Sequence, residues 1–339
     1  MKAFYHPKQR LHHPKSYLSR GQMRTPQEVP ERLDHLLAAA QKLGFTIEQP
    51  ADSGREALYA VHGRPYVDYL ENAWREWHAV EEDWGDEVMS NIFIREGNPL
   101  RGILARTARY LTDGSCPIGE HTFTAAYWSA QCAIAGAKAI IDGAPAAYSL
   151  CRPPGHHARP EGAGGFCYLN NAAIAAQTLR DGGYAKVAIL DTDMHHGQGI
   201  QEIFYSRSDV FYVSLHGDPT NFYPVVAGFD DERGSGAGAG FNLNLPMPHG
   251  ASEEDFFSYL DRADSALRAF APDVLVLSLG FDIYRQDPQA RVAVSQDGFS
   301  RLGARIRSWG MPCLVVQEGG YHLETLEENA RRFFGGFGA

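Results

Sequence analysis

Short apolar runs alternate with amphipathic stretches through the second half of the chain. The runs are rich in Val, Ile, Leu and Ala, which is typical of strands that a sheet buries on both faces. They lie at 146–150, 187–190, 210–215, 274–279 and 313–316, and helical stretches at 171–180, 200–205, 253–270 and 299–309 separate most of them. This alternation of strand and helix predicts a parallel sheet with helices on both faces.

The first part of the chain shows fewer clear periods. Helices are predicted at 31–43, at 65–80, where an aromatic stripe occupies one face, and at 122–141, which is rich in alanine. Residues 1–30 are predicted to form an irregular arm and residues 81–120 an irregular insertion, because neither segment has a helix or strand period. No linker divides the chain, so we expect a single domain over residues 1–339.

Charge and cysteine content exclude several classes of protein. The formal net charge is −10 and no block of lysine or arginine offsets it, which argues against nucleic-acid binding and favours a cationic partner. No apolar run is long enough to span a bilayer, and the first residues lack the apolar core of a signal peptide. The cysteines show no Cys-x-x-Cys spacing, as expected for free thiols in a reducing compartment. We therefore expect a cytoplasmic protein that does not bind a membrane.

Ionisable and hydrogen-bonding residues follow every one of the predicted strands. The segments that contain them are, in chain order, 151–157, 191–197, 214–218, 280–282 and 317–322. In an open parallel sheet the ligand site lies beyond the carboxyl ends of the strands. These segments are therefore predicted to meet at one edge of the sheet and to form a single catalytic pocket.

The segment 191–197, Asp-Thr-Asp-Met-His-His-Gly, concentrates potential metal ligands at one strand end. Carboxylate oxygens and imidazole nitrogens are the ligands that zinc and similar divalent metals take from proteins. If the strand continues, its alternation points Asp191, Asp193 and His195 to the same side. A catalytic zinc takes three protein ligands and keeps an open position, and Asp282 after the fourth strand offers a further carboxylate. We expect Asp193, His195 and Asp282 to bind a metal.

Two further segments offer groups for acid–base chemistry. His156 and His157 follow a Pro-Pro-Gly turn, which can place an imidazole beside a metal-activated water as general base. Tyr321 follows Gly319 and Gly320, and its phenol is a candidate donor to an oxyanion. Packing is the alternative role for an aromatic residue in that position.

Four motifs together resemble those of the histone deacetylase superfamily, and in particular its bacterial acetylpolyamine amidohydrolase branch. They are Arg-Pro-Pro-Gly-His-His at 152–157, Asp-x-Asp-x-His-His-Gly at 191–197, Leu-Gly-Phe-Asp at 279–282 and Glu-Gly-Gly-Tyr at 318–321. The resemblance implies the three-layer arginase–deacetylase α/β fold, with a central parallel sheet of about eight strands flanked by helices. It also implies metal-dependent hydrolysis of an N-acetyl amide.

The resemblance implies a role for each matched residue. Asp193, His195 and Asp282 match the ligands of one zinc ion, His157 the general base and acid, His156 its electrostatic partner, and Tyr321 the tyrosine that polarises the carbonyl. Asp191 matches a residue that supports His156 and binds a structural potassium ion, together with Asp193, His195, Ser214 and Leu215. Gln198 matches the residue that supports His157 in the family. Phe166, Tyr223 and Gly165 match residues of the substrate channel.

Three features depart from the family pattern. Many deacetylases have an aspartate at the position of Gln198, and a neutral amide there stabilises the imidazolium of the general base less. Tyr223 is a phenylalanine in many relatives, so the channel gains a hydroxyl group. Two glutamates that recognise distant amines in related polyamine enzymes fall near Leu104 and Ser115, with Glu120 or a nearby acid as the alternative.

These observations predict an enzyme that uses zinc to remove acetyl groups from small cationic N-acetyl amines such as acetylputrescine, acetylcadaverine and acetylspermidine. The insertion 81–120 matches a segment that contributes to a homodimer contact and narrows the pocket in related enzymes. The same chemistry on acetyl-lysine in proteins, or on another short acyl amide, is the alternative. A dinuclear manganese ureohydrolase and a non-catalytic binding protein of the same fold are more distant alternatives.

Overall fold

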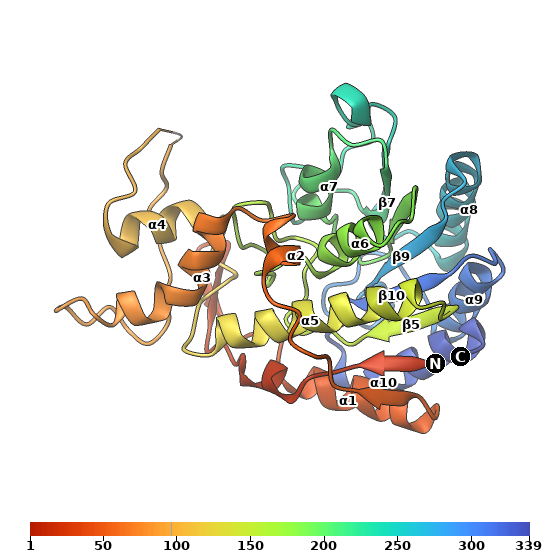
Figure 1. Cartoon of the computed structure of the whole chain (residues 1–339), viewed down its shortest axis with the longest axis horizontal. Helices are drawn as coiled ribbons and strands as arrows, with labels where there is room; N and C mark the ends of the chain where they lie inside the picture. Colours follow the sequence, from red (N-terminus) through yellow and green to blue (C-terminus); the bar gives the residue numbers. More distant parts are fainter. Residues whose placement is uncertain (96) are drawn as a thin grey trace.

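A parallel sheet of eight strands forms the centre of the molecule (Figure 1). The computed structural model describes residues 1–95 and 97–339. In spatial order the strands are β4 (Thr46–Glu48), β1 (Lys2–Phe4), β5 (Ala146–Ser149), β10 (Cys313–Gln317), β9 (Val274–Leu279), β6 (Val187–Asp191), β7 (Val210–Gly217) and β8 (Asn242–Met247). Each neighbouring pair runs parallel. The α/β fold with a parallel sheet, which the strand–helix alternation predicts, is confirmed.

The central strands are buried on both faces of the sheet. Along β6, Ala188 and Leu190 belong to one hydrophobic core, whereas Val187 and Ile189 belong to the other. Successive side chains of a strand point to opposite faces, so one continuous apolar run contributes to two cores. This double burial explains why the central strands are the ones that the sequence pattern predicts.

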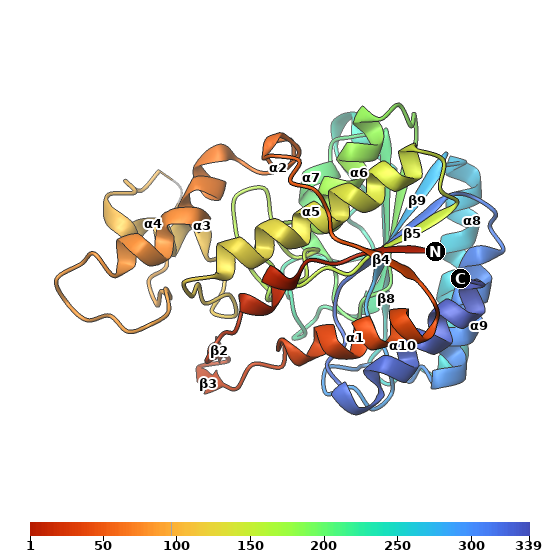
Figure 2. The same ribbon diagram turned by 60° about the horizontal axis from the view of Figure 1, so that its bottom comes forward.

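Helices cover both faces of the sheet, so the molecule has three layers (Figure 2). One face is covered by α1 (Glu31–Lys42), α8 (Glu253–Phe270), α9 (Gln296–Arg307) and α10 (Leu323–Phe337), whose apolar residues join one core. The other face is covered by α5 (Thr122–Ile141), α6 (Asn171–Asp181) and α7 (Gln198–Phe204), with α2 (Glu56–Tyr59) packed beside them. The three-layer architecture is the one that the resemblance implies.

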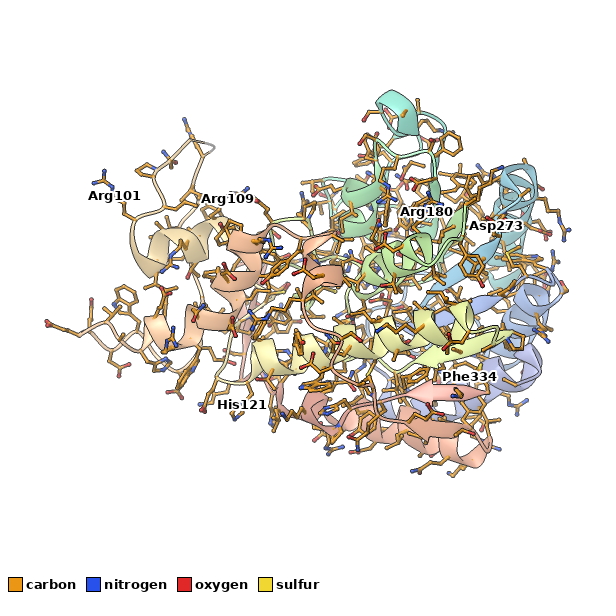
Figure 3. All side chains as sticks on the ribbon, viewed as in Figure 1. Arg101, Arg109, His121, Arg180, Asp273 and Phe334 are labelled. Carbon is orange, nitrogen blue, oxygen red and sulfur yellow. The ribbon has the colours of Figure 1, made fainter. Side chains whose placement is uncertain are left out.

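One part of the chain extends beyond the sheet, at the left of Figure 1. It contains α3 (Arg64–Trp77), α4 (Gly102–Tyr110) and the irregular segment between them. The aromatic stripe of α3 is buried, as its helical spacing predicts. Figure 3 shows Arg101, which directly precedes α4, on the outside of this part. The protruding part thus includes most of the predicted insertion.

Two predictions from the sequence are wrong in part, and the condition attached to a third is not met. Residues 1–30 are not irregular throughout, because β1 lies inside the sheet, a 3₁₀ helix spans Pro7–Leu11 and β2 (Tyr17–Ser19) pairs with β3 (Gln22–Arg24). These pieces are too short to show a period. Residues 81–120 are not irregular throughout, since α4 is a helix. Finally, β6 ends at Asp191, so strand alternation does not orient the residues that follow it.

Two expectations from composition can be compared with the structure. All five cysteines are free and buried, which agrees with the predicted unpaired thiols. Among the residues that the structure describes, no helix is both long and apolar enough to cross a membrane.

Candidate active site

The strand ends that carry ionisable residues are neighbours in the sheet. β5, β10, β9, β6 and β7 follow one another in this order and run parallel, so their carboxyl ends lie at one edge of the sheet. The carboxyl ends of β6, β9 and β7 lie side by side, because Asp191 at the end of β6 pairs with Ser278 of β9 and Ser214 of β7. The loops that follow enclose a cavity of about 430 Å³, whose lining includes His157 and His195.

Asp193, His195 and Asp282 form a buried group with the composition of a metal site. One ligand atom from each of them lies within 4.8 Å of the others. His195 Nδ1 is 3.2 Å from Asp193 Oδ1 and 3.1 Å from Asp282 Oδ2. Burial and the neighbouring Asp193 carboxylate raise the pKa of Asp282, a cost that a cation between the two carboxylates would remove. Two carboxylates and one imidazole fit a catalytic zinc, which takes three protein ligands of these types.

Main-chain N–H groups and two glycines hold these carboxylates in place. The Gly319 N–H donates to Asp193 Oδ2 at 2.8 Å, and the Met194 N–H donates to Asp282 Oδ1 at 2.9 Å. A Cβ atom on Gly319 would lie 2.5 Å from Asp193 Oδ2, and one on Gly280 would lie 2.4 Å from the same atom. Only glycine leaves room for the carboxylates, which accounts for the glycines in the Leu-Gly-Phe-Asp and Glu-Gly-Gly-Tyr motifs.

His156 lies between two aspartates. Its Nδ1 is 3.1 Å from Asp191 Oδ2, and its Nε2 is 3.7 Å from Asp193 Oδ1. Burial lowers the pKa of His156, but the charges of Asp193 and Asp191 outweigh burial and raise this pKa to about 10. The Tyr212 hydroxyl also donates to Asp191 Oδ2, at 2.9 Å, so Asp191 is held from both sides.

His157 lies in a different environment from its neighbour in the sequence. Its Nδ1 is 2.6 Å from Gln198 Oε1, so a proton on Nδ1 donates to the amide oxygen. Burial and the nearby charges of His156 and His195 lower the pKa of His157 well below its usual value. An imidazole of this kind is neutral near pH 7 and can accept a proton.

The residues predicted for the substrate channel line the cavity. Phe166, Tyr223 and Gly165 all contribute to its walls, and the Tyr223 ring packs edge-on against His157 with centroids 4.7 Å apart. Gly165 has φ +55°, and a Cβ atom there would lie 2.2 Å from the His157 ring, so the position requires glycine. The walls at this point are therefore aromatic and closely packed.

Tyr321 reaches the same cavity from the turn after β10. Its main-chain N–H donates to Asp287 Oδ2 at 2.6 Å. The buried Arg32 guanidinium lies 5.0 Å from the Tyr321 ring centre and donates to the carbonyl oxygens of Gly320 and Glu318 at 2.6 and 2.5 Å. Burial raises the pKa of Tyr321, so the phenol keeps its proton at neutral pH.

The remaining predicted residues lie around Asp191. Ser214 pairs with Asp191 across the β6–β7 ladder, and its hydroxyl lies 2.8 Å from His216 Nδ1. Leu215 follows it and is fully buried. His196 Nε2 lies 3.1 Å from Asn244 Oδ1.

Sequence reasoning missed the roles of two carboxylates at this site. Glu318 accepts hydrogen bonds from the Gly155 N–H at 2.7 Å and from the Ser278 hydroxyl at 3.0 Å, and thereby ties together three strand ends. Its place in the Glu-Gly-Gly-Tyr motif is the signal that could have indicated this role. Asp113 accepts from the Tyr223 hydroxyl at 2.7 Å, and nothing in its irregular sequence neighbourhood indicates such a contact.

The positions considered for amine recognition lie in different places. Ser115 lines the catalytic cavity, but Leu104 of α4 does not. Glu120 lines a separate surface cavity together with residues such as Trp74. Of the residues described by the structure that line the catalytic cavity, Asp113 alone carries a carboxylate.

Comparison with known proteins agrees with this geometry. Residues 26–337 match the family model of the histone deacetylase domain. The chain is 67% identical over 339 residues to the acetylpolyamine amidohydrolase of Burkholderia pseudomallei, covering 100% of this chain and 99% of that protein. It is 38% identical to the acetylpolyamine amidohydrolase of Mycoplana ramosa, covering 97% of each chain.

A solved structure gives the same result for the fold. The crystal structure of acetylpolyamine aminohydrolase from Burkholderia pseudomallei superposes with a TM-score of 0.99, covering 100% of this chain and 99% of that one. The expected resemblance is confirmed, and the ureohydrolase alternative has no support among these relatives. The chain belongs to the histone deacetylase family and is a hydrolase, a deacetylase of that family.

Proposed function

We propose that this enzyme is a zinc-dependent amidohydrolase that releases acetate from small cationic N-acetyl amines, most of all acetylated polyamines. The observation that carries the proposal is one cavity lined by His157, His195 and Tyr321, with the Asp193–His195–Asp282 group at the same place. Two relatives that match 99% or more of this chain are named acetylpolyamine amidohydrolases. Their names support acetylpolyamines as the substrate class.

The proposed metal site uses Asp193, His195 and Asp282 and holds one zinc ion per chain. Zinc bound there would polarise the acetyl carbonyl and lower the pKa of a water molecule. The Gly319 and Met194 N–H groups restrain the two carboxylates, so the ligands are oriented before any ion binds.

His157 is the proposed general base and then the general acid. Its Nδ1–H is engaged with Gln198, which leaves Nε2 to take the proton from the attacking water. The same nitrogen then delivers that proton to the leaving amine. His156, held by Asp191, lies beside it with ring centroids 3.8 Å apart and contributes an electrostatic role.

Tyr321 is the proposed donor to the oxyanion. The phenol keeps its proton, and Arg32 and Asp287 hold the turn that carries it. A donor fixed in place before the reaction stabilises developing negative charge without reorganisation.

The cavity and the overall charge favour a slender cationic substrate. Phe166 and Tyr223 offer aromatic walls for an alkyl chain, and the net charge of −10 attracts cations. Cytoplasmic location, in keeping with acetylated polyamines as metabolites, is part of the proposal.

We also propose a structural potassium ion and a homodimer. The potassium ion would bind to Asp191, with Asp193, His195, Ser214 and Leu215 completing the site, and it would offset the burial that raises the pKa of Asp191. Phe93 in the protruding part is 96% exposed. Contact with a second copy of the chain would bury this apolar side chain, and its exposure therefore supports a dimer.

Steady-state kinetics with acetylputrescine, acetylcadaverine, acetylspermidine and an acetyl-lysine peptide test this function. We expect the acetylpolyamines to have the higher kcat/KM. Tyr321→Phe should lower kcat by roughly 10²–10³-fold with little change in KM, because the lost donor acts on the oxyanion. A clear preference for the peptide would contradict the substrate assignment, and a fully active Tyr321→Phe enzyme would contradict the role of the phenol.

A further inference from the structure

A continuous chain of hydrogen bonds leads from His157 to a carboxylate outside the metal group. His157 Nδ1 lies 2.6 Å from Gln198 Oε1, and Gln198 Nε2 lies 3.2 Å from the Tyr223 hydroxyl oxygen. The Tyr223 hydroxyl lies 2.7 Å from Asp113 Oδ2. The chain therefore joins four side chains from four separate loops or element ends.

The direction of each hydrogen bond follows from Asp113. This carboxylate also accepts from the Gly165 N–H at 3.1 Å and from the Ser115 N–H at 2.8 Å, so donors surround it. An ionised carboxylate only accepts, and the Tyr223 hydroxyl must therefore donate to it. The phenol has one proton, so its oxygen can only accept from Gln198.

The hydrogen bond that Tyr223 donates to Asp113 also determines the orientation of the Gln198 amide. An amide carries a donor NH₂ at one end and an acceptor oxygen at the other, and by itself it can face His157 with either. Because the Tyr223 oxygen accepts, the NH₂ group faces Tyr223 and the amide oxygen faces His157. His157 must then carry its proton on Nδ1, which leaves Nε2 free as a base.

We propose that Asp113 is a positioning residue that sets the tautomer of His157 through Tyr223 and Gln198. This inference rests on the proposed function of His157 as general base. Burial and the Asp113 charge raise the pKa of Tyr223, which keeps the phenolic proton in the chain. The hydroxyl on the channel wall thereby has a function, since a phenylalanine would interrupt the chain.

The competing explanation is that Asp113 binds the distant amine of the substrate. The two roles make different kinetic predictions. A residue that positions the base affects kcat for every acetamide, whereas a residue that binds an amine affects KM for cationic acetamides only. Acetylputrescine and its uncharged isostere N-pentylacetamide separate these cases.

The test compares Asp113→Asn and Tyr223→Phe in the zinc-loaded full-length enzyme. Each variant should lower kcat by about 10- to 100-fold, by the same factor for both substrates, and the double variant should be no worse than either single one. Tyr223→Phe leaves Asp113 and its other donors intact, so it tests the chain even if Asp113→Asn folds poorly. A loss confined to KM for acetylputrescine, or additive losses in the double variant, would overturn the proposal.

Gln198→Glu provides a rescue experiment. A carboxylate in direct contact with His157 accepts from Nδ1 without help from Tyr223, so Asp113→Asn should have little further effect in that background. The matched control is Asp52→Asn, because Asp52 also accepts from a tyrosine hydroxyl (Tyr127) and a glycine N–H (Gly54) but is exposed and does not line the cavity. An undiminished effect of Asp113→Asn beside Gln198→Glu would overturn the proposal.

A spectroscopic readout does not depend on turnover. Long-range ¹H–¹⁵N correlation spectra distinguish the two neutral tautomers of histidine, and the signal of His157 is assigned by its loss in His157→Ala. We expect the Nδ1–H tautomer in the unaltered enzyme and in Asp52→Asn, and a shift toward the Nε2–H tautomer in Asp113→Asn. An unchanged Nδ1–H tautomer in Asp113→Asn would contradict the proposal. Failure of the proposed function would be seen instead as a lack of acetate release by the unaltered zinc-loaded enzyme.

Discussion

At the scale of single residues, the absence of a side chain is as important as its presence. Gly280 and Gly319 allow two buried carboxylates to approach the same point, and Gly165 allows the channel wall to contact His157. The donors to these carboxylates are main-chain N–H groups, which do not change rotamer and therefore hold the site without extra side chains. The ligands are thus oriented by their surroundings.

Gly319→Ala tests this interpretation. The added methyl group would lie 2.5 Å from Asp193 Oδ2 and 2.8 Å from Asp282 Oδ2, so one carboxylate has to move. We expect zinc affinity and kcat/KM to fall by at least about tenfold, measured by zinc titration and acetate release. Gly335→Ala in α10 is the control, because a Cβ atom there meets no atom within 4 Å. Unchanged zinc affinity in Gly319→Ala would show that the close approach is not required.

At the scale of elements, the start of α6 holds the loop that carries the tandem histidines. The Asn170 side chain caps α6 and donates to the carbonyl oxygen of Ala158 at 2.9 Å. His62, between α2 and α3, accepts from the Asn170 N–H at 2.9 Å and lies 3.0 Å from the Arg159 carbonyl oxygen. The segment between α2 and α3 and the catalytic loop are therefore connected through one buried imidazole.

This connection makes the stability of the fold depend on pH. Burial lowers the pKa of His62 from 6.5 to about 4, so protonation favours the unfolded chain. The contribution of neutral His62 to the free energy of unfolding is fully present above pH 6.5 and is lost as the pH falls from 6.5 to about 4. Between about pH 7.5 and 5 this loss amounts to about 2 kcal/mol.

His62→Gln removes the titrating group while keeping a polar side chain. We expect the free energy of unfolding in urea to fall between about pH 7.5 and 5 in both proteins. The decrease should be larger in the unaltered protein than in His62→Gln, by about 2 kcal/mol. Other buried histidines contribute equally to both proteins and cancel in the comparison. Equal losses would show that His62 is not the source of this pH dependence.

At the scale of the whole molecule, the sequence predicts the long helices and the doubly buried central strands, but it does not predict β8 or α4. The Val274–Leu279 strand and the Thr122–Ile141 helix end where the pattern predicts. By contrast, β1 and β4 have three residues each and are held in the sheet by pairing, β1 with β5 and β4 with β1. Short elements of this kind depend on tertiary contacts, which a local pattern does not contain.

The site also contains residues that a local sequence pattern predicts and residues that only tertiary contacts bring together. Asp193, His195 and Asp282 are predictable because each follows an apolar strand of a parallel sheet, and parallel strand ends meet. Asp113 and Tyr223 are 110 positions apart, and their contact depends on how the loop after α4 packs against the loop after β7. No spacing rule connects two such loops, so this part of the site becomes visible only in three dimensions.

Zinc titration of chelator-treated enzyme tests the central claim most directly. Acetate release from acetylputrescine should be absent without metal and should reach its maximum at one equivalent of zinc per chain. Asp282→Asn, which keeps the shape of the side chain but removes a charged ligand, should not be activated by that amount. Acetate release by the metal-free protein at the rate of the zinc-loaded enzyme, or saturation only at two equivalents, would contradict a single catalytic zinc at Asp193, His195 and Asp282.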